Sequence, residues 1–222
     1  MQTQSSIVIA IDGPAASGKS SVARKLARRL GYEHINSGAF YRAITWFLLE
    51  KNLLDTAEQD DEQISQVLAA TRMSCSIQSG NFLVAIDGHA LDDELHSDEV
   101  NANVSRVAAM PVVRNYLLAP LRSYAQKHNI IMEGRDIGSV VFPDSSYKFY
   151  LDASPEIRSQ RRSAQGQEDS ILNRDKLDSS RKAAPLIVAD DAVTVDSSHL
   201  SIDGVVDKII EHLRAKGLRI DT

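Results

Sequence analysis

The chain has one cysteine, Cys75, among its 222 residues. A single cysteine excludes an intrachain disulfide and a metal site built from several cysteines. Long hydrophobic runs are also missing, because no stretch approaches the roughly eighteen apolar residues of a membrane-spanning helix. The first apolar run, residues 7–11, is short and has no basic leader, so we do not expect a signal peptide. We therefore expect a cytoplasmic location and no membrane partner.

Basic residues are too few to outweigh the acidic ones. The 25 Lys and Arg residues against 30 Asp and Glu give a formal net charge of −5. An acidic chain is a poor general binder of polyanions, so nucleic acid is not an expected partner. The length suits one sizeable α/β core with small insertions. The sequence has no obvious additional apolar helix face, and we expect a monomer.

The segment 13–20 reads Gly-Pro-Ala-Ala-Ser-Gly-Lys-Ser and matches G-x-x-x-x-G-K-[ST], the phosphate-binding loop. The apolar run 7–11 before it predicts a buried parallel strand, and residues 20–30 after it predict a helix. The motif therefore stands between a strand and a helix, which is where a phosphate site needs it. Lys19 is expected to reach the β- and γ-phosphates of ATP, and the Ser20 hydroxyl to coordinate Mg²⁺.

The expected ATP contacts are this loop, the serine after it and one arginine further along the chain. The loop would point its backbone N–H groups at the phosphates, because Gly13 and Gly18 permit backbone angles that a Cβ forbids. The predicted ATP-binding residues are Gly13, Pro14, Ala15, Ala16, Ser17, Gly18, Lys19, Ser20, Ser21 and Arg158.

Strand-like and helix-like segments alternate along most of the chain, which predicts an α/β fold with a parallel sheet flanked by helices. Further strands are predicted at 32–35, 129–132, 147–151 and 192–195, and further helices at 39–51 and 200–213. With the strand at 7–11, the predicted parallel sheet has five strands.

One region breaks this alternation. Residues 72–91 alternate with period two and carry turn signals at 79–81 and 87–88, so they predict a small antiparallel meander. With the helical segments around it, the meander forms a predicted insertion at 61–104. We expect this insertion to bind a second substrate, the alternative being a surface decoration without a ligand.

A second segment, 156–181, concentrates arginine in an otherwise acidic chain. Arginine suits phosphate because its planar fork meets two oxygens at once. A solvated helical face is the ordinary explanation of a charge run, but here the phosphate loop supplies an anion, and we predict a lid over the triphosphate. The arginines are Arg158, Arg161, Arg162, Arg174 and Arg181. The predicted organisation is core at 1–60, insertion at 61–104, core at 105–157, lid at 158–185 and core at 186–222.

The phosphate loop alone does not distinguish a kinase from a GTPase or a mechanical ATPase. The Asn-Lys-x-Asp motif of GTPases is absent, and the strand at 129–132 does not end in Asp, as the Walker B strand of a mechanical ATPase usually does. The strand at 129–132 is followed instead by Glu133-Gly134-Arg135-Asp136, at the strand end where α/β sheets bind ligands. Arg135 is a candidate clamp on an acceptor phosphate and Asp136 a candidate partner of a base, the alternative being a salt bridge within a turn.

Three further segments carry a pattern more specific than the loop. They are Asn-Ser-Gly-Ala-Phe-Tyr-Arg at 36–42, Gly-Arg-Asp-Ile-Gly-Ser-Val-Val-Phe-Pro at 134–143, and the spaced set Arg-Asp-x-x-Asp-x-x-Arg at 174–181. With the loop, they make nearly the whole chain resemble the bacterial cytidylate kinases, the (d)CMP kinase branch of the nucleoside monophosphate kinases. The chain departs from the family pattern at Glu133, where Asp is usual, and in a shorter lid.

The resemblance implies a P-loop NTPase fold with an NMP-binding insertion and a helical lid. It implies phosphoryl transfer from ATP to CMP or dCMP with Mg²⁺. The catalytic residues that it implies are Lys19, Arg135, Arg162 and Arg181. The CMP-binding residues that it implies are Ser37, Tyr41, Arg42, Ser105, Arg114, Gly134, Arg135, Asp136, Arg174, Asp178 and Arg181.

Two other functions fit the phosphate loop. One is another small-molecule P-loop kinase, acting on UMP, on both UMP and CMP, or on a metabolite alcohol. The other is a non-catalytic nucleotide-binding module or regulatory ATPase. Shikimate-type kinases lack a β insertion such as 72–91, and the intact Lys19-Ser20 pair argues against a non-catalytic module. We therefore expect a (d)CMP kinase.

Overall fold

The computed structural model describes residues 6–54, 60–78, 81–164, 171–181 and 184–220, with the backbone alone at 78, 81 and 171–174. Its contacts divide the chain into two compact units. The first unit comprises Met1–Ile35 and Ala125–Thr222, and the second comprises Asn36–Tyr124. The second unit is therefore inserted into the first along the chain.

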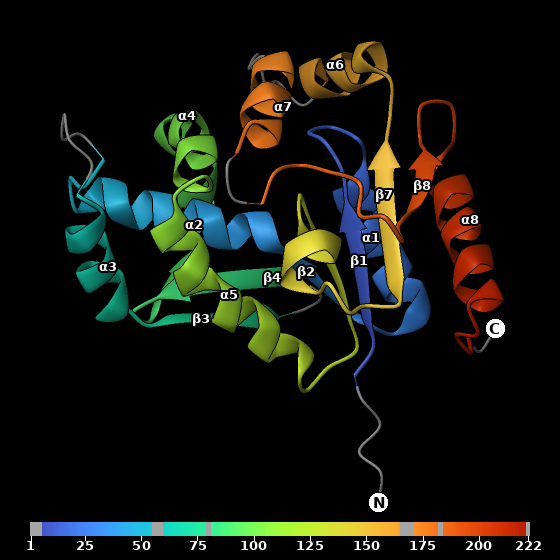
Figure 1. The fold of residues 1–222 in the computed structure, drawn as a ribbon, viewed down its shortest axis with the longest axis horizontal. Helices are drawn as coiled ribbons and strands as arrows, with labels where there is room; N and C mark the ends of the chain where they lie inside the picture. The colour runs from blue at the N-terminus through green and yellow to red at the C-terminus, as the bar shows by residue number, and fades with distance from the viewer. Residues whose placement is uncertain (1–5, 55–59, 79–80, 165–170, 182–183, 221–222) are drawn as a thin grey trace, which may run out of the picture. The chain divides into compact units, whose positions relative to one another are not determined.

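A five-stranded parallel sheet forms the centre of the first unit, as the sequence predicts (Figure 1). The strand order is β2-β6-β1-β7-β8. Because β1 lies in the middle and is covered on both faces, it needs the apolar, β-branched sequence that it has. The strands are β1 (Val8–Asp12), β2 (Glu33–Asn36), β6 (Ile130–Gly134), β7 (Tyr147–Asp152) and β8 (Val193–Asp196).

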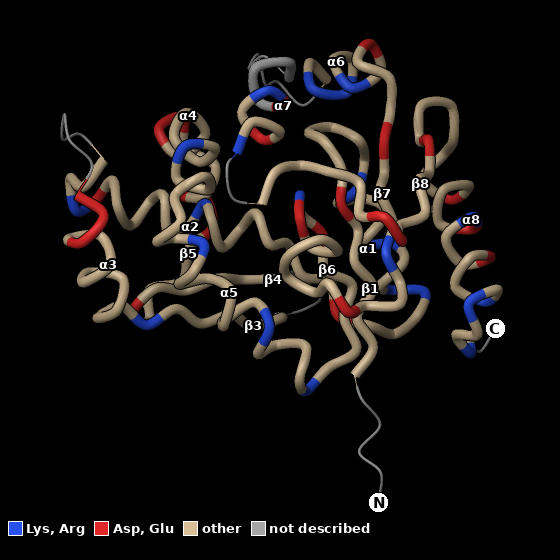
Figure 2. The backbone as a smooth tube through the Cα atoms, viewed as in Figure 1, with Lys and Arg blue, Asp and Glu red and all other residues tan. Residues whose placement is uncertain are grey.

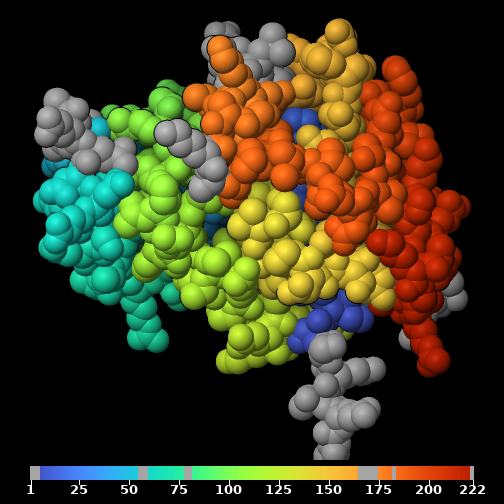
Figure 3. All heavy atoms as spheres, in the orientation of Figure 1, coloured from blue at the N-terminus to red at the C-terminus, as the bar shows by residue number. Residues whose placement is uncertain are grey.

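Helices α1 (Lys19–Leu30) and α8 (Ile202–Ala215) pack on one face of this sheet. Val22 and Leu26 of α1 are buried in the same apolar cluster as alternate residues of β1 and β7, such as Ile11 and Phe149. The outer side of α8 lies at the surface of the first unit in the space-filling view (Figure 3). Helix α1 ends where the sequence predicts, because Gly31 takes the left-handed conformation, φ 66°, at its C-cap.

Three shorter elements complete the first unit around the carboxyl ends of the strands. A single π-helical turn, η2 (Ile137–Val141), follows β6 directly. Helix α6 (Pro155–Ser163) follows β7, and its start is set by Ser154, whose hydroxyl accepts the N–H of Ile157, and by Pro155 in its first turn. Helix α7 (Ile171–Ser179) packs against α6.

The described residues of the second unit form a three-stranded antiparallel sheet, in the order β3-β4-β5, and five helical segments. The sheet confirms the meander predicted at 72–91, although residues 79–80 of its first turn lie outside the described part of the chain. The elements are α2 (Ser37–Glu50), α3 (Asp61–Ala69), β3 (Met73–Gln78), β4 (Asn81–Ile86), β5 (His89–Leu91), η1 (Asp93–His96), α4 (Asp98–Val107) and α5 (Pro111–Ala125).

The predicted elements are present, with ends displaced by one or two residues. Displacements of two residues occur at the starts of α2 and α8 and at the ends of β6 and α8. Side-chain caps explain the two helix starts, because Asn36 accepts the N–H of Gly38 and Ser201 accepts the N–H of Gly204. The boundaries predicted for the insertion and the lid stay predictions. No helix among the described residues is long and apolar enough to span a bilayer.

We predict that Leu26→Ala lowers the free energy of unfolding by about 2–5 kcal/mol, because it leaves a cavity in the core under β1. The measurement is urea denaturation followed by circular dichroism. Leu177→Ala is the matched control, since Leu177 is 53% exposed, and it should change the stability by less than about 0.5 kcal/mol. Equal losses in the two variants would contradict this description of the core.

Candidate functional site

The phosphate-binding loop starts at Gly13, where the chain passes so close to the backbone of β7 that a side chain has no room. A Cβ added to Gly13 would lie 2.1 Å from the carbonyl oxygen of Leu151, so this position accepts glycine alone without a backbone shift. At the other end, Gly18 takes the left-handed conformation, φ 89°, as the N-cap of α1. Ala16 also has a positive φ, 59°, which is uncommon for a residue with a Cβ. The loop is thus held in a conformation that most sequences avoid.

Lys19 folds over this loop. It is 7% exposed, and its Nζ donates a hydrogen bond to the Pro14 carbonyl oxygen at 2.8 Å. Burial and the nearby charge of Arg135 lower the pKa of Lys19 to about 7, although Glu133, Asp178 and Asp12 act in the opposite direction. The predicted catalytic lysine therefore sits at the loop with a proton that it holds weakly.

Ser20 is linked to a buried carboxylate at the end of β6. Its hydroxyl donates to Glu133 Oε2 at 2.7 Å, and His34 Nε2 lies 3.2 Å from the other oxygen, Oε1. Burial raises the pKa of Glu133, but the hydrogen bonds from His34 and Ser20 and the charge of Lys19 outweigh it, so the pKa lies below its usual range. Glu133 therefore remains an anion beside the predicted magnesium ligand.

Asp12, the last residue of β1, points its carboxylate at the turn after β6. Its Oδ1 accepts the N–H of Ile137 at 2.8 Å and its Oδ2 accepts the N–H of Gly138 at 2.7 Å. Burial raises the pKa of Asp12 to about 6, even though these two hydrogen bonds favour the anion. This carboxylate caps η2 across 125 residues of sequence.

Two of the predicted phosphate-binding arginines meet on one carboxylate. Arg135 Nε donates to Asp178 Oδ2 at 2.9 Å, and Arg181 Nη2 donates to Asp178 Oδ1. Asp178 is 3% exposed, so both ion pairs are shielded from water. Asp178 and Arg135 also act on the pKa of Lys19, which places all three within electrostatic reach of one another.

The arginines of α6, visible as blue segments in Figure 2, reach back to the phosphate loop. Arg158 is buried and donates to the carbonyl oxygens of Ala153, at 3.0 Å, and Ala15, at 3.3 Å, and it pairs with Asp175 of α7. Arg161 donates to Ser197 of the loop after β8. Arg158 is therefore not part of a solvated helical face.

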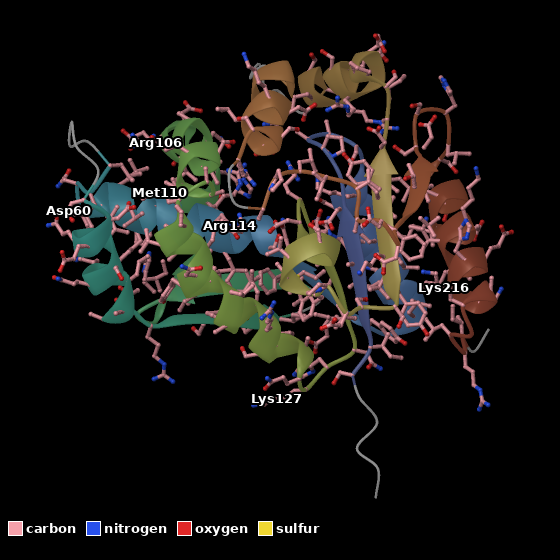
Figure 4. All side chains as sticks on the ribbon, in the orientation of Figure 1. Asp60, Arg106, Met110, Arg114, Lys127 and Lys216 are labelled. Carbon is pink, nitrogen blue, oxygen red and sulfur yellow. The ribbon has the colours of Figure 1, made fainter. Side chains whose placement is uncertain are left out.

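The second unit carries its own arginines, of which Arg42 is half-buried and Arg114, labelled in Figure 4, is buried. Arg42 of α2 donates to the Leu95 carbonyl oxygen at 2.9 Å and to Asn101 Oδ1 at 2.8 Å. Arg114 of α5 is 9% exposed and donates to the Ala108 carbonyl oxygen at 2.9 Å. Its guanidinium lies over the ring of Tyr41, 5.5 Å from the centroid.

The remaining predicted residues are less informative. Ser37 is buried in the first turn of α2, Gly134 and Asp136 are buried beside η2, Ser105 and Arg162 are half-buried, and Ser21 is exposed. The side chain of Arg174 lies outside the described part of the structure. Ser17 is buried, and its Oγ has no hydrogen-bond partner among the described residues. The roles predicted for all of these residues stay predictions.

Three carboxylates that contact the predicted site were not assigned to it from sequence. Asp12 and Glu133 end neighbouring strands of the sheet, and Asp175 pairs with Arg158. The signal available for the first two is a lone acid at the end of an apolar run, which is a costly place for a charge without a partner. The signal available for Asp175 is its place in the spaced set Arg-Asp-x-x-Asp-x-x-Arg at 174–181.

The oxygen atoms near Ser20 fit a magnesium ion in part. A hydroxyl and a carboxylate are ligands that Mg²⁺ accepts, and the ion usually takes few protein ligands together with water and phosphate oxygens. No group of three or more His, Cys, Asp and Glu side chains suited to hold a metal occurs among the described residues. The loop, Lys19 and the arginines are suited to bind a polyphosphate that brings such an ion with it.

Comparison with known proteins gives a consistent result. A family model described as cytidylate kinase matches residues 9–215. A cytidylate kinase of Alkaliphilus metalliredigens is 41% identical, with 94% of this chain and 96% of the relative covered. One of Rhodococcus opacus is 42% identical, with 93% and 94% covered, and one of Thermotoga maritima is 38% identical, with 94% and 97% covered.

We predict that the protein takes up a proton when it binds a triphosphate at pH 8. Lys19, with a pKa of about 7, is mostly neutral at this pH, and the bound anion favours its charged form. The measurement is calorimetric titration with MgATP in two buffers that differ in ionisation enthalpy. The uptake should shrink toward pH 6, where Lys19 is already protonated, and it should be absent in Lys19→Met. The same uptake in wild type and variant would contradict the assignment.

Proposed function

This chain belongs to the cytidylate kinase family, and we propose that it transfers the γ-phosphoryl group of ATP to CMP, giving ADP and CDP. The observation that supports this most strongly is the grouping of Lys19, Arg135, Asp178 and Arg181 beside one phosphate-binding loop. A triphosphate site needs the loop and the lysine, and the transfer of a phosphoryl group needs further cations around it.

The first unit supplies the groups suited to the donor. Lys19 and the backbone of residues 13–20 would hold the β- and γ-phosphates, and Arg158, which already contacts the Ala15 carbonyl, would close over the loop. Ser20 and Glu133 are the residues that would hold Mg²⁺, which when bound neutralises charge on the phosphates. Arg135 and Arg181 would meet the phosphoryl group during transfer.

The second unit supplies groups suited to the acceptor nucleotide. Arg42 is fixed by Leu95 and Asn101, and Arg114 is fixed by Ala108 and Tyr41. Cations held in this way lose little side-chain entropy when an anion or a polar base edge binds. We propose that these two arginines, with Ser37 and Ser105, bind the nucleoside and its phosphate, and that Asp136 and Asp178 of the first unit also contact CMP.

The reaction that we propose needs no general base. The attacking group is a phosphate oxygen of CMP, which is already ionised at neutral pH. The protein would therefore act by positioning the two nucleotides and by stabilising negative charge as the phosphoryl group moves. Water must be excluded meanwhile, because an open site would hydrolyse ATP.

The proposed acceptor range rests on the family resemblance. We propose that dCMP is used as well as CMP. Another nucleoside monophosphate such as UMP is the alternative, and it requires a different hydrogen-bond pattern at the base. The monomeric state and the cytoplasmic location stay predictions from the sequence.

We predict that CMP and dCMP are the preferred acceptors in a coupled ADP-release assay over a panel of nucleoside monophosphates and shikimate. Lys19→Ala should lower kcat by at least about 10²-fold, because it removes a charge that acts on the moving phosphoryl group, while CMP binding is largely kept. Unchanged turnover in this variant would contradict the mechanism. A preference for UMP or shikimate would contradict the proposed acceptor.

We predict that Arg114→Ala and Asp136→Ala mainly damage the use of CMP. Each should lower kcat/KM for CMP by about 10²-fold, since removing a buried polar partner of the nucleotide costs a few kcal/mol. Arg122→Ala, on the exposed side of the same helix as Arg114, is the control and should leave kcat/KM near the wild-type value. Wild-type kcat/KM in both test variants would show that the assigned pocket is wrong.

A further inference from the structure

The carboxylate of Asp12 joins two parts of the first unit that the proposed reaction uses separately. Asp12 immediately precedes Gly13, the first residue of the phosphate loop. Its two oxygens accept the backbone N–H groups of Ile137 and Gly138, at 2.8 and 2.7 Å, and these residues immediately follow Arg135 and Asp136. One buried side chain therefore bridges the donor loop and the segment assigned to the acceptor.

The start of the turn after β6 has no side-chain cap from its own residues. Asp136 is the N-cap of η2, but its own side chain makes no capping hydrogen bond. A π-helical turn is rare and less favourable than an α-helical one, so it needs support from outside. Two N–H groups at its start would be buried without partners if Asp12 did not accept them. The side chain of Asp12 thus replaces a local cap by one from a neighbouring strand.

Close packing holds the same turn from its other side. A Cβ added to Gly138 would lie 3.2 Å from Cγ and Cδ of Lys148 and 3.4 Å from Asp12 Oδ2. Lys148 is itself fixed, because its Nζ donates to the Pro143 carbonyl oxygen and pairs with Asp191. Gly138 therefore lies between Asp12 of β1 and Lys148 of β7, with little room to move.

We propose that Asp12 is a positioning residue, which fixes Arg135 and Asp136 relative to the phosphate loop by holding the peptide groups of Ile137 and Gly138. It contacts neither nucleotide in this proposal and acts through the backbone alone. The inference rests on the proposed function, since it is tested by measuring kcat/KM for CMP. Its physical reason is that a displacement of about 1 Å at a reacting group can cost about 10²-fold in rate.

The charges around Asp12 determine how its hydrogen bonds to Ile137 and Gly138 respond to pH. Asp136 opposes ionisation of Asp12 and Lys19 favours it, while Lys148, on β7, is engaged by Asp191. With burial, these charges place the pKa of Asp12 near 6. Below that pH one oxygen carries a proton, and the carboxyl group can no longer accept both N–H groups as an anion does. Loosening of the turn should therefore begin as the pH falls through about 6.

The test compares Asp12→Asn with Asp60→Asn. Asparagine keeps the shape of aspartate but offers one acceptor oxygen and an NH₂ group, so at position 12 one buried N–H loses its partner. We expect Asp12→Asn to lower kcat/KM for CMP by about 10²-fold while KM for ATP changes less than about threefold. Asp60, labelled in Figure 4, also accepts two backbone N–H groups, as the cap of α3, and its variant should behave as wild type.

Two additional measurements separate positioning from a loss of folding. The amide proton shifts of Ile137 and Gly138 should titrate near pH 6 in the wild type and not in Asp12→Asn. Gly138→Ala leaves Asp12 in place but displaces the same turn. It should therefore also lower kcat/KM for CMP while KM for ATP changes little. Two results would overturn the proposal. One is an equal loss of kcat/KM for ATP and for CMP in Asp12→Asn, and the other is the same pH dependence of the amide shifts in wild type and Asp12→Asn.

The outcome also separates this inference from the proposed function. A wild-type protein that does not phosphorylate CMP would refute the function, while the amide titration would still decide whether Asp12 holds the turn. A wild-type protein that is active with CMP, combined with an Asp12→Asn variant of unchanged kinetics, would refute the positioning role alone.

Discussion

The close approach of Gly13 to the backbone of β7 is the constraint on which the rest of the site depends. No Cβ fits between Gly13 and the Leu151 carbonyl oxygen, so glycine is needed for the chain to leave β1 along this path. The path sets where Gly18 begins α1 and therefore where Lys19 and Ser20 lie. The functional side chains of the first helical turn are thus positioned by backbone packing in the sheet.

Pairing of charge is the second organising feature. The candidate site gathers Lys19, Arg135, Arg158 and Arg181 in a small buried region, and such charges would repel one another and lose hydration without anions among them. Asp175 and Asp178 of α7 and Glu133 of β6 supply these anions. The carboxylates are therefore as much a part of a phosphate site as its cations.

The fold was largely predictable because its signals are local. Alternation of strands and helices, the stop at Gly31 and the period-two pattern of 72–91 each lie within a few residues, and the elements expected from them are present. The phosphate loop was predictable for the same reason. The ends of helices were less so, since caps such as Asn36 shift a boundary by one or two residues.

The contacts within the site were not predictable in the same way. Ser20 and Glu133 are 113 residues apart, and Asp12 and Ile137 are 125 apart. Such pairs depend on the order and register of parallel strands, which no single segment encodes. The arginines could be recognised by their number and chemistry, but the carboxylate that each one contacts, such as Asp178 for Arg135, follows from the folded chain alone.

The bridge that Asp178 forms between Arg135 and Arg181 has a consequence for affinity. A phosphate that binds Arg135 and Arg181, as we propose, would compete with an internal counter-ion that is already in place. Its binding free energy is therefore a difference between two sets of ion pairs, and a dianion gains more from the exchange than a monoanion does. A carboxylate held in this position therefore disfavours the binding of weakly charged solutes and favours that of dianions.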